Sequence, residues 1–296
     1  MKLKIWFLET RPQFLILSLA LAFLGNCMAW NDGAFSPGYA FWAFLGLLLT
    51  HTSVNTLNDY FDYRSGIDLE TRRTPFSGGS GILSAALLKP KQVLWLGLAS
   101  FLLAILIGVY FLIVRGWLLL PVLLIAAVCV FLYSPIILRL RWPEWSPGIG
   151  LGFLPVLGTY FIQTAAYTLP AIVASVPSGI LVHNLLLLNE FPDVEADKKG
   201  GRKTLPITMG KTRASLVYSA LTMLVYFWVT GAVVAGVMPT PSLIAWLTLP
   251  LALKAIRGAL KHDDPSKLVP AMGNNVLVVL LTQVLLGLGY ILARVF

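Results

Sequence analysis

Long apolar stretches recur along the whole chain and leave little room for polar structure between them. We count nine, each about 18 to 23 residues long, which is the length an α-helix needs to cross the hydrocarbon core of a bilayer. Hydrophobic residues make up 57% of the 296 and charged residues only 12%, too little polar surface for a soluble globule. The sequence therefore predicts an all-α integral membrane bundle of nine transmembrane helices. The expected spans are 13–30, 38–57, 92–113, 117–134, 148–166, 169–190, 214–236, 241–258 and 271–293.

The basic residues indicate how this bundle is oriented. Almost all of the 22 Lys and Arg fall in alternate segments between the spans, beginning with the N-terminus. Because cytoplasmic loops retain Lys and Arg, we expect a cytoplasmic N-terminus. The net charge of +9 is then explained by orientation and contact with anionic lipid, and no nucleic acid partner is expected. We expect a single membrane-embedded domain over 1–296, with its main cytoplasmic loops at 58–91 and 189–213.

Acidic residues gather in two short segments. "NDYFDYRSGIDLE" at 58–70 and "NEFPDVEAD" at 189–197 together hold eight of the 13 acidic residues. Both segments follow an even-numbered span, so both are expected on the cytoplasmic side. At about 3 kcal/mol for each Asp placed at the bilayer centre, these carboxylates must lie at the membrane edge or in a wet cavity.

Spacing groups the polar residues of each segment. In the first, one helical face is predicted to carry Asn55, Asn58, Asp59 and Asp62, which are separated by steps of three and four. Gly66 is expected to end that helix and to leave Asp68 on a turn.

The second segment has a similar but less regular arrangement. Asn189, Asp193 and Asp197 are spaced four residues apart, which would again place them on one helical face. Pro192 argues against a continuous helix through this segment.

Carboxylate and amide oxygens without His or Cys are hard ligands of the kind that hold Mg²⁺, with Ca²⁺ as an alternative. Arg and Lys residues follow both segments. Acid, metal and cation together describe a site that binds a diphosphate. The alternative is that these charges are only interfacial anchors. That explains the cations, but it does not explain why most of the acids occupy two short segments.

These motifs resemble those of the UbiA-type superfamily of membrane polyprenyltransferases, whose pattern is nine helices with an aspartate-rich motif after the second and the sixth. The resemblance covers essentially the whole chain. It implies that an allylic isoprenoid diphosphate binds through Mg²⁺, that its C1–oxygen bond ionises, and that an aromatic acceptor attacks the resulting cation. It also implies a multi-pass protein of a bacterial or archaeal cell membrane with the active site facing the cytoplasm. The metal ligands implied are Asn58, Asp59, Asp62, Asp68, Asn189, Asp193 and Asp197.

Further roles follow from the same resemblance. Catalytic roles are implied for Asp62, Asp193 and Tyr133, the last in "YSPIILRLR" at 133–141. Cations implied to bind the diphosphate are Arg11 in "TRP", Arg72, Arg139 and Lys203 in "GGRKTLP". For Arg11, a role as a membrane anchor is the alternative.

Three polar residues within the spans are candidates for binding the acceptor. His51 lies four residues before Asn55 and shares its predicted face, while His183 lies inside the sixth span. Hydrogen bonds between helices are the alternative explanation for these residues. The stretch "FSGGSGIL" at 76–83 lacks the Lys-Ser/Thr ending of a phosphate-binding loop and is expected to form a flexible lid.

Among the branches of this superfamily, the chain looks most like the 1,4-dihydroxy-2-naphthoate polyprenyltransferases of menaquinone synthesis. Glu190 and Pro192 depart from the usual residues of the second motif, so acceptors of the 4-hydroxybenzoate, tetrapyrrole and lipid branches remain alternatives. A CDP-alcohol phosphatidyltransferase is disfavoured because "DGAFSP" at 32–37 departs from the D-G-x-x-A-R opening of that class. A secondary transporter is disfavoured because transporters place their ionisable groups near mid-membrane.

Overall fold

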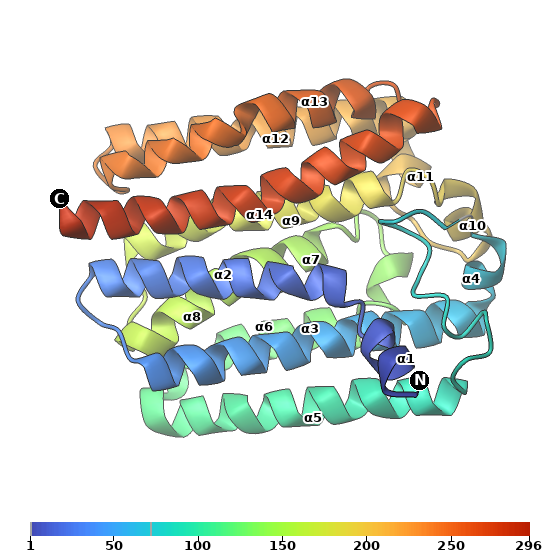
Figure 1. Cartoon of the computed structure of the whole chain (residues 1–296), viewed down its shortest axis with the longest axis horizontal. Helices are drawn as coiled ribbons and strands as arrows, with labels where there is room; N and C mark the ends of the chain where they lie inside the picture. Colours follow the sequence, from blue (N-terminus) through green and yellow to red (C-terminus); the bar gives the residue numbers. More distant parts are fainter. Residues whose placement is uncertain (1, 72) are drawn as a thin grey trace.

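The structure, a computed structural model, describes residues 2–71 and 73–296. Helices are the only regular secondary structure in these residues, and the long ones lie side by side along one axis (Figure 1). This confirms the predicted all-α bundle. The long elements are α2 (Pro12–Asn31), α3 (Pro37–Ser65), α5 (Pro90–Arg115), α6 (Leu120–Phe131), α8 (Leu154–Thr164), α9 (Leu169–Asn189), α12 (Lys211–Val234), α13 (Leu249–Ala259) and α14 (Pro265–Val295). The short ones are α1 (Lys2–Glu9), α4 (Ile67–Glu70), η1 (Trp117–Leu119), η2 (Ile137–Arg139), α7 (Trp145–Pro147), η3 (Gly148–Phe153), α10 (Val194–Lys199), α11 (Leu205–Met209) and η4 (Thr240–Thr248).

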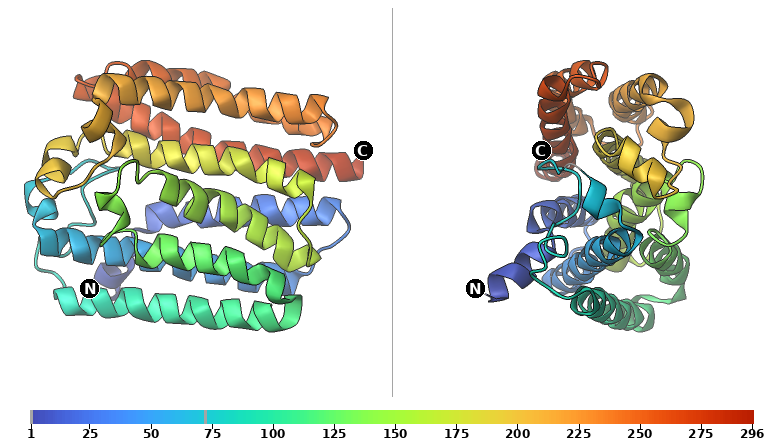
Figure 2. Two further views of the ribbon diagram at one scale, coloured as in Figure 1. Left: turned by 180° about the vertical axis from the view of Figure 1, so that it is seen from behind. Right: turned by 90° about the vertical axis from the view of Figure 1, so that its right-hand side faces the viewer.

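The two ends of the bundle differ in construction. Short helices α1, α4, α10 and α11 gather at one end with the longest irregular loop, whereas the C-terminus lies at the other end (Figures 1 and 2). Both acidic motifs therefore reach the same end of the molecule. The expected placement of both motifs on one face of the membrane agrees with this arrangement.

Each predicted span corresponds to helix. Among the described residues, seven helical stretches are long and apolar enough to cross a membrane. The other two predicted spans are α3, whose last turns carry the polar motif, and the shorter stretch Trp117–Phe131. The structure thus contains the bundle of membrane-spanning helices, while the count of nine spans and the side of the N-terminus stay predictions.

Helix α3 carries the first motif well beyond its predicted apolar span. Ser36 caps its start, where the hydroxyl accepts a hydrogen bond from the Tyr39 N–H at 3.4 Å. The helix then continues to Ser65 and ends at Gly66, whose φ of 82° lies in the left-handed region that favours glycine. The predicted helix end is confirmed. Asp68 follows in the short helix α4.

The second motif does not form one continuous helix. Helix α9 ends at Asn189, a turn follows, and α10 begins after Asp193. Pro192 lies within that turn, where its missing N–H does not interrupt a helical hydrogen bond. The bend places Asn189 and Asp197 on different helices.

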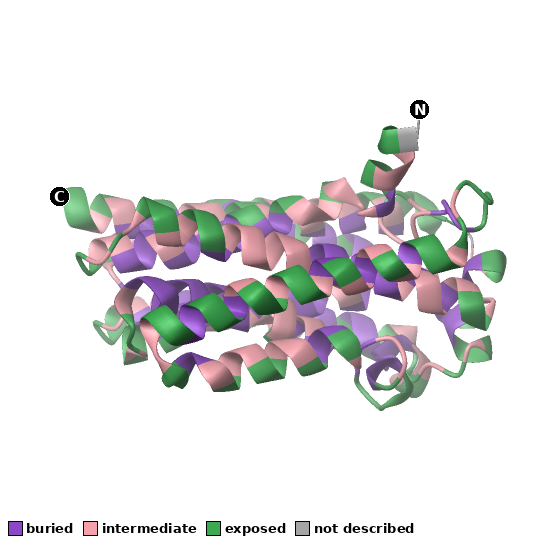
Figure 3. Ribbon diagram, turned by 90° about the horizontal axis from the view of Figure 1, so that it is seen from below, coloured by how far each residue is buried: buried purple, intermediate pink, exposed green. Residues whose placement is uncertain are grey.

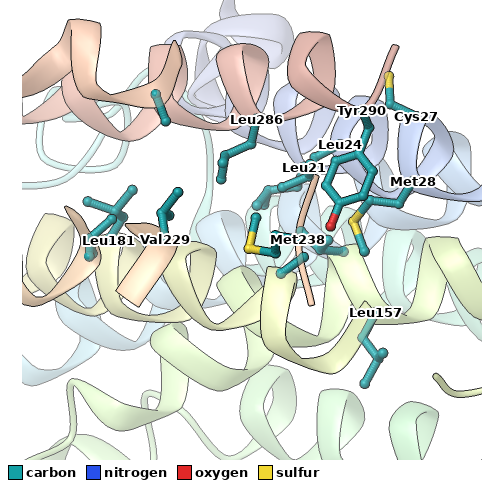
Figure 4. Close-up of a cluster of buried hydrophobic side chains, with 14 of the residues drawn as sticks. Leu21, Leu24, Cys27, Met28, Leu157, Leu181, Val229, Met238, Leu286 and Tyr290 are labelled. Carbon is teal, nitrogen blue, oxygen red and sulfur yellow. The ribbon is translucent and has the colours of Figure 1, made fainter. Parts of the chain in front are cut away.

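The buried apolar core lies along the middle of the bundle. Leu21, Leu24 and Met28 of α2 pack with Leu181 of α9 and Leu286 of α14 (Figure 4). Exposed residues alternate with buried ones along the outer helices (Figure 3). Many exposed side chains are large and apolar, as expected for a surface that faces lipid.

Candidate functional site

A cavity of about 190 Å³ lies at the end of the bundle that carries the short helices. Its walls come from α2, α3, α4, α9, α10 and α14, so residues far apart in the sequence share one space. Most of the predicted metal ligands line it. They are Asn58, Asp62, Asp68, Asn189, Asp193 and Asp197.

Arg202 joins the two motifs. Its guanidinium donates a hydrogen bond to the Asp197 carboxylate at 2.7 Å and forms an ion pair with Asp62 of the first motif. Asp62 and Asp197 lead the attractions that raise the pKa of Arg202, against an opposing effect of burial. Arg202 lines the cavity. Among the described residues, its guanidinium forms ion pairs with both motifs, through Asp62 and Asp197.

The neighbouring Lys203 points elsewhere. Its backbone N–H donates to the Leu138 carbonyl at 3.2 Å, and its carbonyl accepts from the Trp142 N–H at 3.4 Å. These bonds fix the segment so that Arg202 lies inside while the Lys203 side chain is exposed. Arg139, at the end of η2, is also exposed. Neither side chain lines the cavity among the described residues, so their predicted diphosphate roles gain no support from their positions.

Asp59 has different partners from the rest of its motif. It forms an ion pair with Arg11 and accepts a hydrogen bond from the Ser80 N–H at 2.9 Å. Arg11 precedes α2 with a positive φ of 54°, and the Asn55 side chain donates to the neighbouring Thr10 carbonyl at 3.0 Å. The Asp59 carboxylate is therefore used to hold Arg11 at the cavity, and it does not itself line the cavity in the described structure.

The loop that follows the first motif reaches both motifs. The Ser80 hydroxyl donates to Glu9 at 2.8 Å, and the Ser77 hydroxyl lies 3.4 Å from an Asp193 oxygen. Gly79 approaches so closely that a Cβ atom there would lie 2.9 Å from Asp68. The loop covers part of the carboxylates, whereas its predicted flexibility stays a prediction. Arg72, predicted to bind diphosphate, lies outside the described residues.

Burial makes several of these carboxyls hard to ionise. Burial, with the nearby Asp62, raises the pKa of Asp68 to about 7. Burial, with Asp197, raises the pKa of Asp193 to about 7, and burial raises that of Asp197 to about 6 despite the opposing charge of Arg202. A cation that enters this cluster would relieve the repulsion among the carboxylates.

The carboxylate and amide oxygens at the cavity suit a hard cation, but they do not by themselves form a complete coordination shell. Asn189 has a buried amide oxygen without a hydrogen-bond partner in the described structure. Within the described residues, no three His, Cys, Asp or Glu side chains are arranged to hold an ion by themselves. A metal here would need asparagine and substrate oxygens to complete its shell, as Mg²⁺ commonly does.

The predicted acceptor residues separate into two groups. His51 and Asn55 line the cavity, and the His51 Nδ1 lies 2.9 Å from the Ser18 hydroxyl. His183 instead accepts a hydrogen bond from the Trp142 indole at 2.8 Å and lies outside the lining of the cavity as described. Tyr133 does line the cavity and is almost completely buried.

The sequence motifs indicate no individual role for Glu9, Glu144 or Glu190, and they indicate Arg202 only as one of several cations that follow the second motif. Arg202 was visible as a cation beside the second motif, but Lys203 matched the expected motif position. Glu190 stood out as a departure from the motif. No sequence motif marks Glu9 or Glu144, because each is placed by a residue distant in the chain. Glu9 accepts a hydrogen bond from the Ser80 hydroxyl, and Glu144 accepts one from the Leu205 N–H.

The structure thus brings two acidic motifs and Arg202 to one partly apolar cavity of a helical bundle, which is a site suited to a ligand with a charged part and an apolar part. The UbiA prenyltransferase family matches residues 18–287, and the chain belongs to this family. It is therefore a membrane prenyltransferase, which rules against the phosphatidyltransferase and transporter alternatives.

Individual relatives agree with this assignment. The chain is 31% identical to a Bacillus subtilis protein named 1,4-dihydroxy-2-naphthoate octaprenyltransferase, over 96% of this chain and 91% of that protein. It is 28% identical to the Haemophilus influenzae protein of the same name, over 98% of this chain and 97% of that one. In structure it resembles a UbiA homologue from Archaeoglobus fulgidus bound to DMAPP and Mg²⁺, with a TM-score of 0.60, 14% identity, and coverage of 95% of this chain and 98% of that chain.

Proposed function

We propose that the chain transfers a polyprenyl group from an allylic polyprenyl diphosphate to 1,4-dihydroxy-2-naphthoate, with Mg²⁺ as cofactor, in menaquinone synthesis. The observation that carries this proposal is the meeting of both acidic motifs and Arg202 in one cavity that also has an apolar wall. Such a cavity can bind the anionic head and the greasy tail of one substrate.

The residues that would hold Mg²⁺ are the Asn and Asp residues of the two motifs that line the cavity. Asp62 and Asp193 are the central ligands in this proposal, with Asn58, Asn189 and Asp197 beside them. When bound, Mg²⁺ supplies charge neutralisation for the departing diphosphate. Asp59 is proposed to position Arg11 instead, because its carboxylate does not line the cavity in the described structure and bonds that guanidinium and the Ser80 N–H.

Arg11 and Arg202 are the cations proposed to donate hydrogen bonds to diphosphate oxygens. Both guanidiniums line the cavity and are held by carboxylates, so they are oriented before the substrate arrives. Fixed donors stabilise developing negative charge better than water does, since they need little reorganisation during the reaction. Charge-assisted bonds from Arg to phosphate are also among the stronger hydrogen bonds in proteins.

The allylic carbon would lie next to Tyr133. An aromatic ring attracts a nearby cation through its negative face, so Tyr133 is suited to stabilise positive charge that develops on the prenyl group. The tail would follow the apolar wall toward α2 and α14. That wall contains Phe14, Leu17, Leu151, Val182, Val276, Val279 and Leu280.

Similarity to the two named relatives supports the choice of acceptor, since both align over more than nine-tenths of their length. The distribution of Lys and Arg supports a site that faces the cytoplasm. The polyprenyl diphosphate and the aromatic acceptor would meet at that surface, one from the lipid and one from the water.

The test uses the purified full-length chain with Mg²⁺, a polyprenyl diphosphate and each acceptor in turn. We expect a prenylated naphthoate product and one diphosphate released per product. Prenylation of 4-hydroxybenzoate but not of the naphthoate would overturn the acceptor assignment. The absence of Mg²⁺-dependent diphosphate release with every acceptor would overturn the proposed reaction.

A further inference from the structure

Two buried carboxyls lie at the site without a role in binding metal or diphosphate. Glu190 is 6% exposed and lines the cavity just beyond the end of α9. Neither of its carboxyl oxygens accepts a hydrogen bond from a backbone or side-chain donor among the described residues, although the Glu144 carboxyl lies within hydrogen-bonding reach. Because buried polar atoms in folded proteins are almost always hydrogen-bonded, these oxygens are expected to meet a ligand.

Glu144 stands behind Glu190 and is completely buried. One of its oxygens accepts a hydrogen bond from the Leu205 N–H at 2.6 Å, while the other has no partner in the described structure. Burial and the neighbouring Glu144 raise the pKa of Glu190 well above its ordinary value. Glu144 therefore has a fixed position, from which it limits where the Glu190 carboxyl can lie.

Apolar side chains line the cavity with Glu190, and the charged groups of Asp197 and Arg202 also lie near its carboxyl. Tyr133, Leu138 and Leu186 pack against one another and line the same cavity. Pro147 adds a further apolar surface to this lining. A region with apolar walls and one unpaired carboxyl suits a planar aromatic molecule that carries a hydroxyl group.

We propose that Glu190 binds a ring hydroxyl of the aromatic acceptor and that Glu144 acts as its positioning residue. This proposal rests on the prenyl transfer function proposed above. A ring hydroxyl can donate a hydrogen bond to an oxygen of the Glu190 carboxyl whether that carboxyl is neutral or ionised. Glu190 would thus select hydroxylated rings and turn their hydroxyl edge toward the end of α9.

The experiment measures acceptor binding separately from turnover. The full-length protein in detergent is titrated anaerobically with 1,4-dihydroxy-2-naphthoate and with 2-naphthoate, which lacks both hydroxyls. The variants are Glu190→Leu, which removes the polar atoms, and Glu190→Gln, which keeps a hydrogen-bond acceptor. Glu195→Gln is the matched control, since Glu195 is an exposed carboxyl five residues away in α10.

We expect the unchanged protein and the control to bind the dihydroxy compound about tenfold more tightly than 2-naphthoate, as one hydrogen bond allows. Glu190→Leu should abolish this preference, and Glu190→Gln should retain part of it. The KM for polyprenyl diphosphate and the Mg²⁺ requirement should not change in either variant. Glu144→Gln, which keeps the oxygen that accepts from Leu205, should raise the acceptor KM more than it lowers kcat.

The inference would be overturned if Glu190→Leu still bound the dihydroxy compound more tightly than 2-naphthoate. It would also be overturned if the unchanged protein showed no such preference. An equal loss of prenyl diphosphate or Mg²⁺ binding in Glu190→Gln would do the same, because it would make Glu190 a metal ligand. If the binding pattern is as expected but no prenylated product forms, the acceptor site stands and the proposed transfer reaction fails.

Discussion

Arg202 forms a buried ion pair with Asp62, although 140 residues separate them in the chain. Because the same guanidinium also bonds Asp197, a single cation holds both acidic motifs at one cavity. Removal of that cation would leave several buried carboxylates facing one another without a counter-charge.

We therefore predict that Arg202→Met reduces prenyl transfer by about two orders of magnitude and lowers the melting temperature, because breaking a buried ion pair costs about 3–5 kcal/mol. Transfer assays and thermal unfolding in detergent measure the two effects. Lys198→Met, at an exposed position of α10, is the control.

Lys203→Met distinguishes the two assignments of the diphosphate cation. We expect a much smaller effect than for Arg202→Met, since the Lys203 side chain is exposed and does not line the cavity in the described structure. Comparison of the two KM values for polyprenyl diphosphate tests this order. A larger increase for Lys203→Met would favour the assignment made from the motif.

Asp62→Asn and Asp193→Asn should each abolish turnover while the protein remains inserted and monodisperse. Each change removes one anionic oxygen ligand from the cavity without altering the size of the side chain. Mg²⁺-dependent diphosphate release and gel filtration in detergent are the measurements. Full activity in either variant would contradict the proposed metal site.

Asp59→Asn should behave differently from these two variants. Because Asp59 pairs with Arg11 and Ser80, we predict a lower melting temperature and a higher KM for polyprenyl diphosphate, with the Mg²⁺ requirement nearly unchanged. The Mg²⁺ concentration for half-maximal activity is the deciding quantity. A large increase in this concentration, relative to the unchanged protein, would instead make Asp59 a metal ligand.

The pH dependence of metal use should follow from the buried carboxyls. The pKa values of Asp68 and Asp193 are raised to about 7 and that of Asp197 to about 6, so these groups hold protons as the pH falls through this range. Mg²⁺ must displace these protons, and each proton displaced weakens apparent binding about tenfold per pH unit below the pKa. We expect the half-maximal Mg²⁺ concentration to rise between pH 8 and pH 6. A constant value would mean that the carboxyls are ionised throughout.

Local features allowed much of the architecture to be predicted. The apolar stretches gave the positions of the long helices, and Gly66 marked the end of α3 because its backbone conformation disfavours other residues. The motif spacing also selected Asn58, Asp62 and Asp193 as residues that share a cavity. The roles of these residues stay predictions until they are measured.

The sequence by itself determined that the chain is a bundle of membrane-spanning helices and that its two acidic motifs share one side, because helix length and the cost of burying charge are local properties. Only the tertiary structure decided that Arg202 rather than Lys203 enters the cavity, that Asp59 is engaged by Arg11, and that Glu144 stands behind Glu190. These outcomes depend on contacts between segments distant in the chain. Adjacent charged residues have nearly the same chemistry, and only packing determines which of them is buried.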